Sequence, residues 1–158
     1  MAVLERVLGD LRREELKIEV DDVEPLAGIL QLFNFIHEHF RRHPELLHLL
    51  SGENLLRARF LGRSAATPLG ASPLVRLIEK LLRRGQRSGL FRKKIDAVHL
   101  YVTMVALSYF HRSNAYTLSV IFQTDLLDDE WQEDHHKFGA DMLERFLLAT
   151  PKHPSRTV

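Results

Sequence analysis

Apolar residues recur every three or four positions along most of the chain, which is the spacing of amphipathic helices. The first such segment begins at Leu4 and reaches Ile18. Pro25 and Pro44 each begin another segment, because proline is tolerated at the first position of a helix. Few segments alternate with the period of two that is typical of strands. The pattern predicts an all-α protein.

A fourth helix has clear boundaries in the sequence. Ser72 has the side chain of an N-cap residue, and Pro73 follows it at the first helical position. Gly85 and Gly89 predict the end of this helix. Residues 62–72, which are mostly small and polar, predict the one substantial loop of the chain.

A fifth predicted helix, residues 97–110, is apolar around its whole circumference. Eleven of its fourteen residues are apolar or aromatic, none is charged, and Asp96 precedes it as an N-cap. At about 1.5 Å per residue the helix would be roughly 21 Å long, which is too short to cross a bilayer. A helix of this kind must be buried on all sides. It is therefore either the central helix of the core or a helix whose second face another subunit covers.

The last predicted helix carries a stripe of large side chains that favours the second interpretation. The members of this stripe recur at helical spacing and are Trp131, His135, Phe138, Met142, Phe146 and Ala149. Leu143 and Leu147 begin another stripe beside it, and Gly139 permits close approach of a neighbouring helix. Two helices with surplus apolar surface can form a four-helix seam across a twofold axis. We therefore predict a homodimer.

Composition excludes several classes of protein. A chain of 158 residues fits one domain with a sizeable core, and the absence of cysteine excludes disulfide frameworks and thiolate chemistry. No apolar run reaches the roughly 20 residues of a membrane helix. Residues 1–20 carry acids and bases throughout, unlike a secretory signal. These features predict a soluble, cytoplasmic protein.

Charge is unevenly distributed along the chain, although the formal net charge is only +1. Residues 57–94 contain eleven Lys and Arg against the single acid Glu79. Residues 125–144 contain eight acids against the single base Lys137. The basic segment is either a nucleic-acid surface or a solvated helix face. We favour the solvated face, because its basic residues lie at the spacing of one exposed helix face.

Catalytic motifs are absent, since the chain has no GxSxG, no Gly-rich phosphate loop and no HExxH. We therefore predict that it is not an enzyme and binds no cofactor or metal. The alternative is a helical metal-dependent sensor or enzyme that uses His37, His39 and His43, the last two of which have the spacing of one helix face. Against this alternative, Pro44 places His43 beyond the end of its helix. His111 is either a satisfied core histidine or a polar group in a ligand pocket.

Several segments resemble the C-terminal domain of TetR-family transcriptional regulators. Residues 107–122, LSYFHRSNAYTLSVIF, match the pattern YF..SN..TLS.IF that is typical of one branch of the family. Residues 43–45 at a helix start, residues 53–54 within that helix and residues 73–92 match in the same order. The resemblance covers about residues 3–149.

This resemblance implies an all-α bundle that dimerises through the four-helix seam and binds a small, largely hydrophobic effector among its second to fifth helices. Effector binding would then control DNA binding, with repression as the expected outcome. The candidate ligand-binding residues are Phe33, His37, Phe40, Leu50, Asn54, Leu81, Met104, Leu107 and His111. Ordinary core packing is the alternative for the apolar members of this set. The candidate dimer-interface residues are Tyr109, Tyr116, Phe122, Trp131, His135, Phe138, Met142 and Phe146.

The resemblance also indicates where the chain differs from the family pattern. Regulators of this family carry an N-terminal three-helix DNA-binding domain, joined to the sensor domain by a connecting helix. Residues 3–7 resemble the later part of that helix, so we expect residues 1–20 to be its remainder and no DNA-contacting residue to be present. We expect residues 1–150 to form the ligand-binding and dimerisation domain, and residues 151–158 to be a flexible tail.

Overall fold

A computed structural model describes residues 2–61 and 73–149 of the chain. This part of the chain forms seven helices, and its one strand-like pairing is an isolated antiparallel bridge between Phe91 and Leu148. The expected all-α class is therefore confirmed. The predicted loop 62–72, the Ser72 cap and the predicted tail 151–158 lie outside the described residues.

Local sequence signals set the ends of the helices. The helices are α1 (Ala2–Glu15), α2 (Pro25–Arg42), α3 (Pro44–Leu55), α4 (Pro73–Arg87), α5 (Ala97–Ser113), α6 (Ala115–Phe122) and α7 (Asp129–Leu147). Pro25 and Pro44 occupy first helical positions, and the Asp96 carboxylate accepts the backbone N–H of His99 at 2.8 Å. Asn114 separates α6 from α5, a break that the apolar pattern of the sequence did not reveal.

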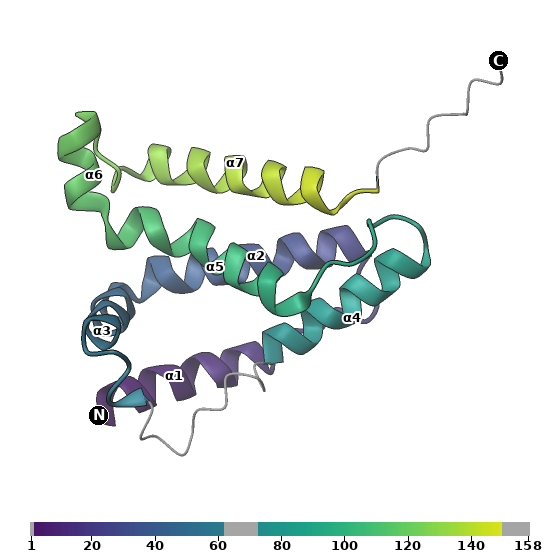
Figure 1. Ribbon diagram of the computed structural model, residues 1–158, viewed down its shortest axis with the longest axis horizontal. Helices are drawn as coiled ribbons and strands as arrows, with labels where there is room; N and C mark the ends of the chain where they lie inside the picture. Colours follow the sequence, from purple (N-terminus) through teal and green to yellow (C-terminus); the bar gives the residue numbers. More distant parts are fainter. Residues whose placement is uncertain (1, 62–72, 150–158) are drawn as a thin grey trace.

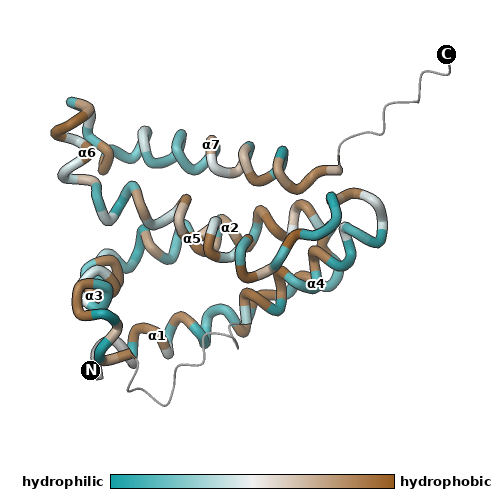
Figure 2. The backbone as a smooth tube through the Cα atoms, viewed as in Figure 1, coloured by the Kyte–Doolittle hydropathy of each residue, from teal (hydrophilic) through white to brown (hydrophobic). Residues whose placement is uncertain are grey.

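Helices α2 and α5 lie at the centre of the molecule, and the other helices pack around them (Figure 1). Helix α7 lies on one side of this central pair, α1 and α4 lie on the other, and α3 lies at one end (Figure 1). Hydrophobic and hydrophilic positions alternate along α1 and α4, as expected of amphipathic helices (Figure 2). The largest fully buried apolar side chains of the core include Ile29, Leu32, Phe33, Leu46, Leu74, Ile78, Leu81, Phe91, Met104 and Leu147.

Helix α5 is apolar on two opposite faces, of which only one is buried. Leu100 and Met104 face the core with 2% and 0% of their surface exposed, whereas Val98, Val102 and Phe110 are 50%, 57% and 58% exposed. Positions two apart on an α-helix differ by about 200°, so these two sets face opposite directions. Among the described helices, none is both long enough and apolar enough to cross a membrane. The uncharged segment therefore supplies the core on one side and an apolar surface on the other.

Two glycines let neighbouring helices approach α2 closely. A Cβ atom on Gly139 of α7 would lie 3.0 Å from Cζ of Phe33, and a Cβ atom on Gly28 would lie 2.6 Å from Cδ2 of Leu81 on α4. A larger residue at either position would therefore force the opposing side chain to move. Gly139 thus has the close-approach role that its sequence position predicted.

Two basic residues of α4 contact the segment between α1 and α2. Lys80 pairs with Asp21, and the Arg84 guanidinium donates to the carbonyl oxygens of Val20 at 2.8 Å and Val23 at 2.7 Å. These contacts hold residues 20–23 against α4. They give part of the basic segment a structural role at the surface of the fold.

Candidate functional site

A largely apolar cavity of about 170 Å³ lies among α1, α2, α3, α4 and α5. We term it the α1 cavity, because α1 supplies two of its few polar groups. Its described walls are Leu8, Leu11, Arg12, Glu15, Phe35, Ile36, His39, Phe40, Leu46, Leu50, Leu74, Tyr101 and Val105. A hollow lined mainly by apolar side chains, with a few converging polar groups, is the usual form of a small-molecule site.

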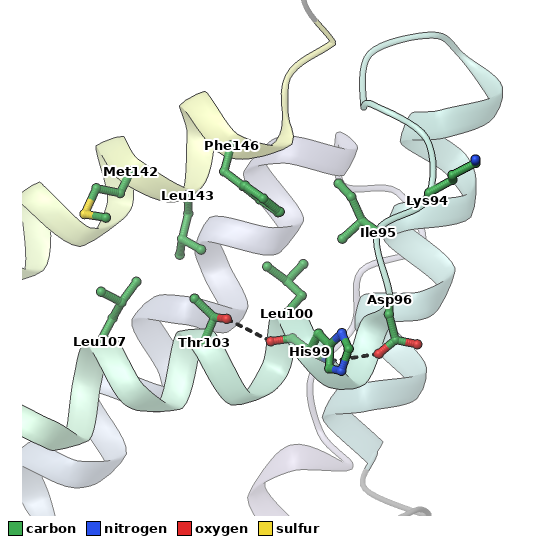
Figure 3. A pocket seen from close by; sticks show the side chains of 10 residues that line it. All are labelled: Lys94, Ile95, Asp96, His99, Leu100, Thr103, Leu107, Met142, Leu143 and Phe146. Atoms are coloured by element: carbon green, nitrogen blue, oxygen red, sulfur yellow. Dashed lines mark hydrogen bonds between the residues drawn. The ribbon is translucent and has the colours of Figure 1, made fainter.

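A second hollow of about 270 Å³, termed the α5–α7 groove, lies between the first half of α5 and the last half of α7 (Figure 3). Leu143 and Phe146 point from α7 toward Leu100 on α5 (Figure 3). Phe146 and Met142 remain 42% and 47% exposed. This hollow therefore belongs to the apolar surface of the molecule, whereas the α1 cavity lies among five helices.

The polar end of the α1 cavity is built around an ion pair within α1. Arg12 Nη1 lies 2.5 Å from Oε2 of Glu15, whose side chain is fully buried. Burial and then the Glu15 carboxylate raise the pKa of Tyr101, while Arg12 acts in the opposite direction. Tyr101 is therefore an uncharged hydroxyl at neutral pH, beside a pair whose charges compensate each other.

His39 adds one more polar group to the wall of the cavity. Its side chain is almost fully buried, and its Nδ1 atom lies 3.5 Å from Oε2 of Glu14 on α1. Burial, followed by the neighbouring His43, lowers the pKa of His39, so the ring is neutral at physiological pH. Within the part of the chain that the structure describes, neither ring nitrogen of His39 makes a hydrogen bond.

A separate cluster of four histidines lies where α2, α5 and α7 meet. The rings of His37 and His136 stack at 4.1 Å between centroids, and those of His111 and His135 lie 4.4 Å apart. His111 Nε2 donates to Oε1 of Gln132 at 2.9 Å, because the amide nitrogen of Gln132 is used to donate to a backbone carbonyl. Burial is the first cause that lowers the pKa of His37 to about 3 and that of His111 to about 4. The cluster is therefore an uncharged part of the interior.

The three histidines of the metal alternative do not converge. His37 stacks on His136 of α7, whereas His39 faces Glu14 of α1 and lies beside His43. Positions two apart on one helix point in nearly opposite directions. Among the described residues, no group of three or more His, Asp or Glu side chains could hold a metal ion. The metal-dependent alternative is therefore not favoured.

The predicted ligand-binding residues lie in five different environments. Phe40 and Leu50 line the α1 cavity, and Leu107 lines the α5–α7 groove. The three fully buried core residues of the predicted set are Phe33, Leu81 and Met104. The two members that belong to the histidine cluster are His37 and His111. The remaining member, Asn54, is exposed on α3.

The buried polar side chain of this part of α3 is that of Glu53, which precedes Asn54 in the sequence. Glu53 is almost fully buried, and its Oε2 atom accepts the backbone N–H groups of Phe60 at 3.2 Å and Leu61 at 2.9 Å. These two bonds hold the segment that follows α3. Glu53 therefore stabilises the fold, whereas the side chain of Asn54 is exposed.

Sequence reasoning missed the polar groups of the cavity wall: Arg12, Glu15, His39 and Tyr101. One signal for them was present, because Glu15 follows Leu8 and Leu11 at helical spacing and so lies on the apolar stripe of α1. A carboxylate on a buried stripe needs a partner. That requirement indicates a polar site at this end of the bundle.

Five predicted interface residues are exposed at 42% or more, and these are Tyr116, Phe122, Phe138, Met142 and Phe146. Tyr109 instead turns inward, where its hydroxyl lies 2.9 Å from Oγ of Ser51. Trp131 and His135 are partly buried, and their rings stack at 4.9 Å. Sequence reasoning did not select five other exposed apolar residues of α5 and α6, which are Val98, Val102, Phe110, Val120 and Ile121.

The helices around the cavity are similar to those of a known protein family. Residues 25–143, which include α2 to α6 and most of α7, match the family described as the tetracyclin repressor-like C-terminal domain. The chain is also similar to the HTH-type transcriptional repressor NicS of Pseudomonas putida, with 31% identity over 147 residues. That alignment covers 93% of this chain and 69% of the relative.

Proposed function

Because the chain belongs to the TetR family of transcriptional regulators and carries its ligand-sensing C-terminal domain, we propose that the α1 cavity is the effector site. The position of the cavity is the observation that supports this most strongly. A molecule bound there touches α2 to α5, the helices expected to surround the effector, and also touches α1. The effector is therefore a small, largely hydrophobic compound.

The walls of the cavity provide a route from the effector to DNA. Four wall residues, Leu8, Leu11, Arg12 and Glu15, come from α1, which the family resemblance assigns to the connection with the DNA-binding domain. An effector that binds more tightly to one position of α1 shifts the population toward that position. Couplings of this kind are typically about 1–3 kcal/mol. We propose that the regulator acts in this way as a repressor, which is what the name of the relative states of that protein.

We also propose that the domain forms a homodimer through α5, α6 and α7. Val102 and Phe110 on α5, Val120 on α6 and Phe138 on α7 are each more than half exposed. Large exposed apolar areas on a soluble protein often mark an interface with another protein. A second copy is the favoured occupant, because two helices from each copy form a four-helix seam across a twofold axis. A dimer also matches the paired half-sites that helix-turn-helix regulators read.

The effector-site proposal is tested by filling the cavity. Leu50→Trp places an indole in the space, whereas Leu49→Trp adds the same group at a half-buried neighbour that does not line the cavity. A panel of small ring compounds is screened by thermal shift against both variants and the unmodified chain. We expect compounds at about 100 times their Kd to raise Tm by roughly 5–10 °C in the unmodified chain and in Leu49→Trp. Leu50→Trp should lose this effect, and a panel in which no stabilisation depends on Leu50 contradicts the proposal.

A further inference from the structure

We propose that the α5–α7 groove of one copy receives α6 of a second copy, in a dimer whose two α7 helices run antiparallel. This proposal rests on the homodimer proposed above and specifies how its two copies are arranged. Three features of the described surface support it: an apolar groove, an exposed apolar helix at the opposite end of the same helix pair, and a difference in charge between these two ends.

The α5–α7 groove lies at one end of the α5–α7 pair, between the first half of α5 and the last half of α7 (Figure 3). Met142 and Phe146 remain 47% and 42% exposed there. A cavity of about 150 Å³ is sufficient for benzene, so a groove of about 270 Å³ has room for an aromatic side chain. Asp96, the one carboxylate among its described walls, already accepts the backbone N–H of His99. The groove therefore suits an apolar partner.

Helix α6 lies at the other end of the same helix pair, where it joins the end of α5 to the segment before α7 (Figure 1). Its buried residue is Ala115, whereas Tyr116, Val120, Ile121 and Phe122 are between 62% and 79% exposed. Isolated helices of fewer than about 12–15 residues are marginal in water, and α6 has eight residues. A second copy that covers these side chains therefore stabilises α6.

A twofold axis that crosses α7 near its middle brings these two features together. Phe138 lies at the midpoint of α7 (Asp129–Leu147) and is 62% exposed. Rotation about an axis at this point reverses the direction of α7, so α6 of each copy lies over the groove of the other. Both contacts form together, because a twofold interface uses the same surface of both copies. An axis parallel to α7 would instead place the two α6 helices at the same end of the seam.

The charges at the two ends favour the antiparallel arrangement. The end near α6 is acidic, since residues 125–137 contain six Asp and Glu against the single base Lys137. The groove end has a basic rim, since residues 92–94 read RKK. Lys94 lines the groove, and the guanidinium of Arg92 lies over one of its aromatic walls. Antiparallel helices bring unlike ends together, whereas parallel helices bring two acidic ends together.

Cysteine cross-linking tests the arrangement, because the chain has no cysteine of its own. Phe122→Cys on α6 and His99→Cys in the groove are prepared as separate chains, mixed until their subunits exchange, and treated with a short bismaleimide. We expect the mixture to form a linked dimer at least about tenfold faster than either variant alone, whose two thiols lie at opposite ends of the seam, more than about 20 Å apart. Leu55→Cys is the control, because Leu55 is 86% exposed on α3 and should link with neither variant.

Two further measurements keep the test independent of one variant. Ile121→Cys with Val98→Cys repeats the cross-linking at other exposed positions of α6 and of the groove end of α5. Glu130→Lys or Lys94→Glu alone should weaken the dimer about three- to tenfold, and the two substitutions in one chain should restore its affinity to within about twofold.

Light scattering separates failure of this arrangement from failure of the homodimer. If the chain is a dimer in which each variant links faster with itself than with the other, the antiparallel arrangement is overturned and the homodimer remains. A dimer in which neither cysteine pair links, or in which the charge exchange fails to restore affinity, overturns the arrangement as well. A monomeric chain contradicts the homodimer and this arrangement together.

Discussion

His37 of α2 and His136 of α7 stack on each other, with their ring centroids 4.1 Å apart and 29° between their planes. Phe33 continues the stack, since its ring lies 4.8 Å from that of His136. Burial lowers the pKa of His37 to about 3, and it also lowers that of His136. These imidazoles therefore pack as neutral aromatic rings between the central helix and α7.

Acid should destabilise the protein well before its carboxylates are protonated. Between about pH 6.5 and pH 4, His37 and His111 bind protons in the unfolded chain and remain neutral in the folded chain, so unfolding becomes more favourable as the pH falls. Each pH unit in this range removes about 1.4 kcal/mol per histidine. Urea unfolding at about pH 7.5 and about pH 5.5 measures the change. His37→Phe should reduce the difference in stability between the two pH values. His48→Gln, on the exposed side of α3, is the control and should leave this difference unchanged. Equal stability of the unmodified chain at both pH values contradicts the prediction.

Two glycine substitutions should change stability in opposite directions. Gly52 lies inside α3 with nothing near the position of a Cβ atom, so Gly52→Ala should raise the free energy of unfolding by about 0.5–1 kcal/mol. A Cβ atom on Gly85 would overlap the ring of Phe91, so Gly85→Ala should lower it by about 1–3 kcal/mol. Chemical unfolding of both variants checks the pair. If both substitutions change the free energy of unfolding equally, the contact with Phe91 does not restrict the size of the side chain at residue 85.

A charge on the exposed face of α7 should separate the proposed dimer. Phe138 is 62% exposed on that face, and Phe138→Glu would place a carboxylate in an apolar seam. Light scattering should give about twice 18.3 kDa for the unmodified chain. The variant should give the monomer mass of 18.3 kDa at the same micromolar concentration. Leu55→Glu is the control, because Leu55 is 86% exposed on α3, away from this face, and the dimer should persist. A monomeric unmodified chain contradicts the homodimer.

The Arg12–Glu15 pair should behave as a buried unit. Arg12→Met leaves the buried Glu15 carboxylate without its cation and should cost about 3 kcal/mol of stability, whereas Arg12→Met/Glu15→Leu should recover most of this loss. The Arg83–Glu79 pair of α4 is the control: both side chains are more than half exposed, and its removal should cost less than about 1 kcal/mol. Unfolding of these variants, together with the single variant Glu15→Leu, completes a double-mutant cycle. Additive effects at Arg12 and Glu15 would show that the two residues are not coupled.

Local signals in the sequence were sufficient for most of the fold. Pro25, Pro44 and Asp96 marked helix starts correctly, because a missing N–H or a capping carboxylate acts within one turn of its own position. The spacing of apolar residues predicted the all-α class, because this spacing is also set by residues within a few positions of one another. The order of short motifs along the chain indicated the family, which the comparison with known proteins confirmed.

The candidate site depends on packing that no local pattern contains. His37 and His39 are close in the sequence and were grouped as possible metal ligands, yet they face opposite sides of α2. Likewise, the uniformly apolar α5 does not reveal in sequence which of its faces is buried. Tyr109 was predicted for the dimer interface, whereas its hydroxyl lies 2.9 Å from Oγ of Ser51 on α3.

The amino-acid sequence alone therefore determined where several helices begin, the all-α class and the family, because those properties arise from residues within a few positions of one another. Tertiary packing decided which faces the helices bury. It also brought Arg12, Glu15 and His39 together in the wall of one cavity, and it left apolar residues of α5, α6 and α7 exposed. Burial depends on atoms from distant segments. The function of a side chain here is therefore set by the helix that lies opposite it.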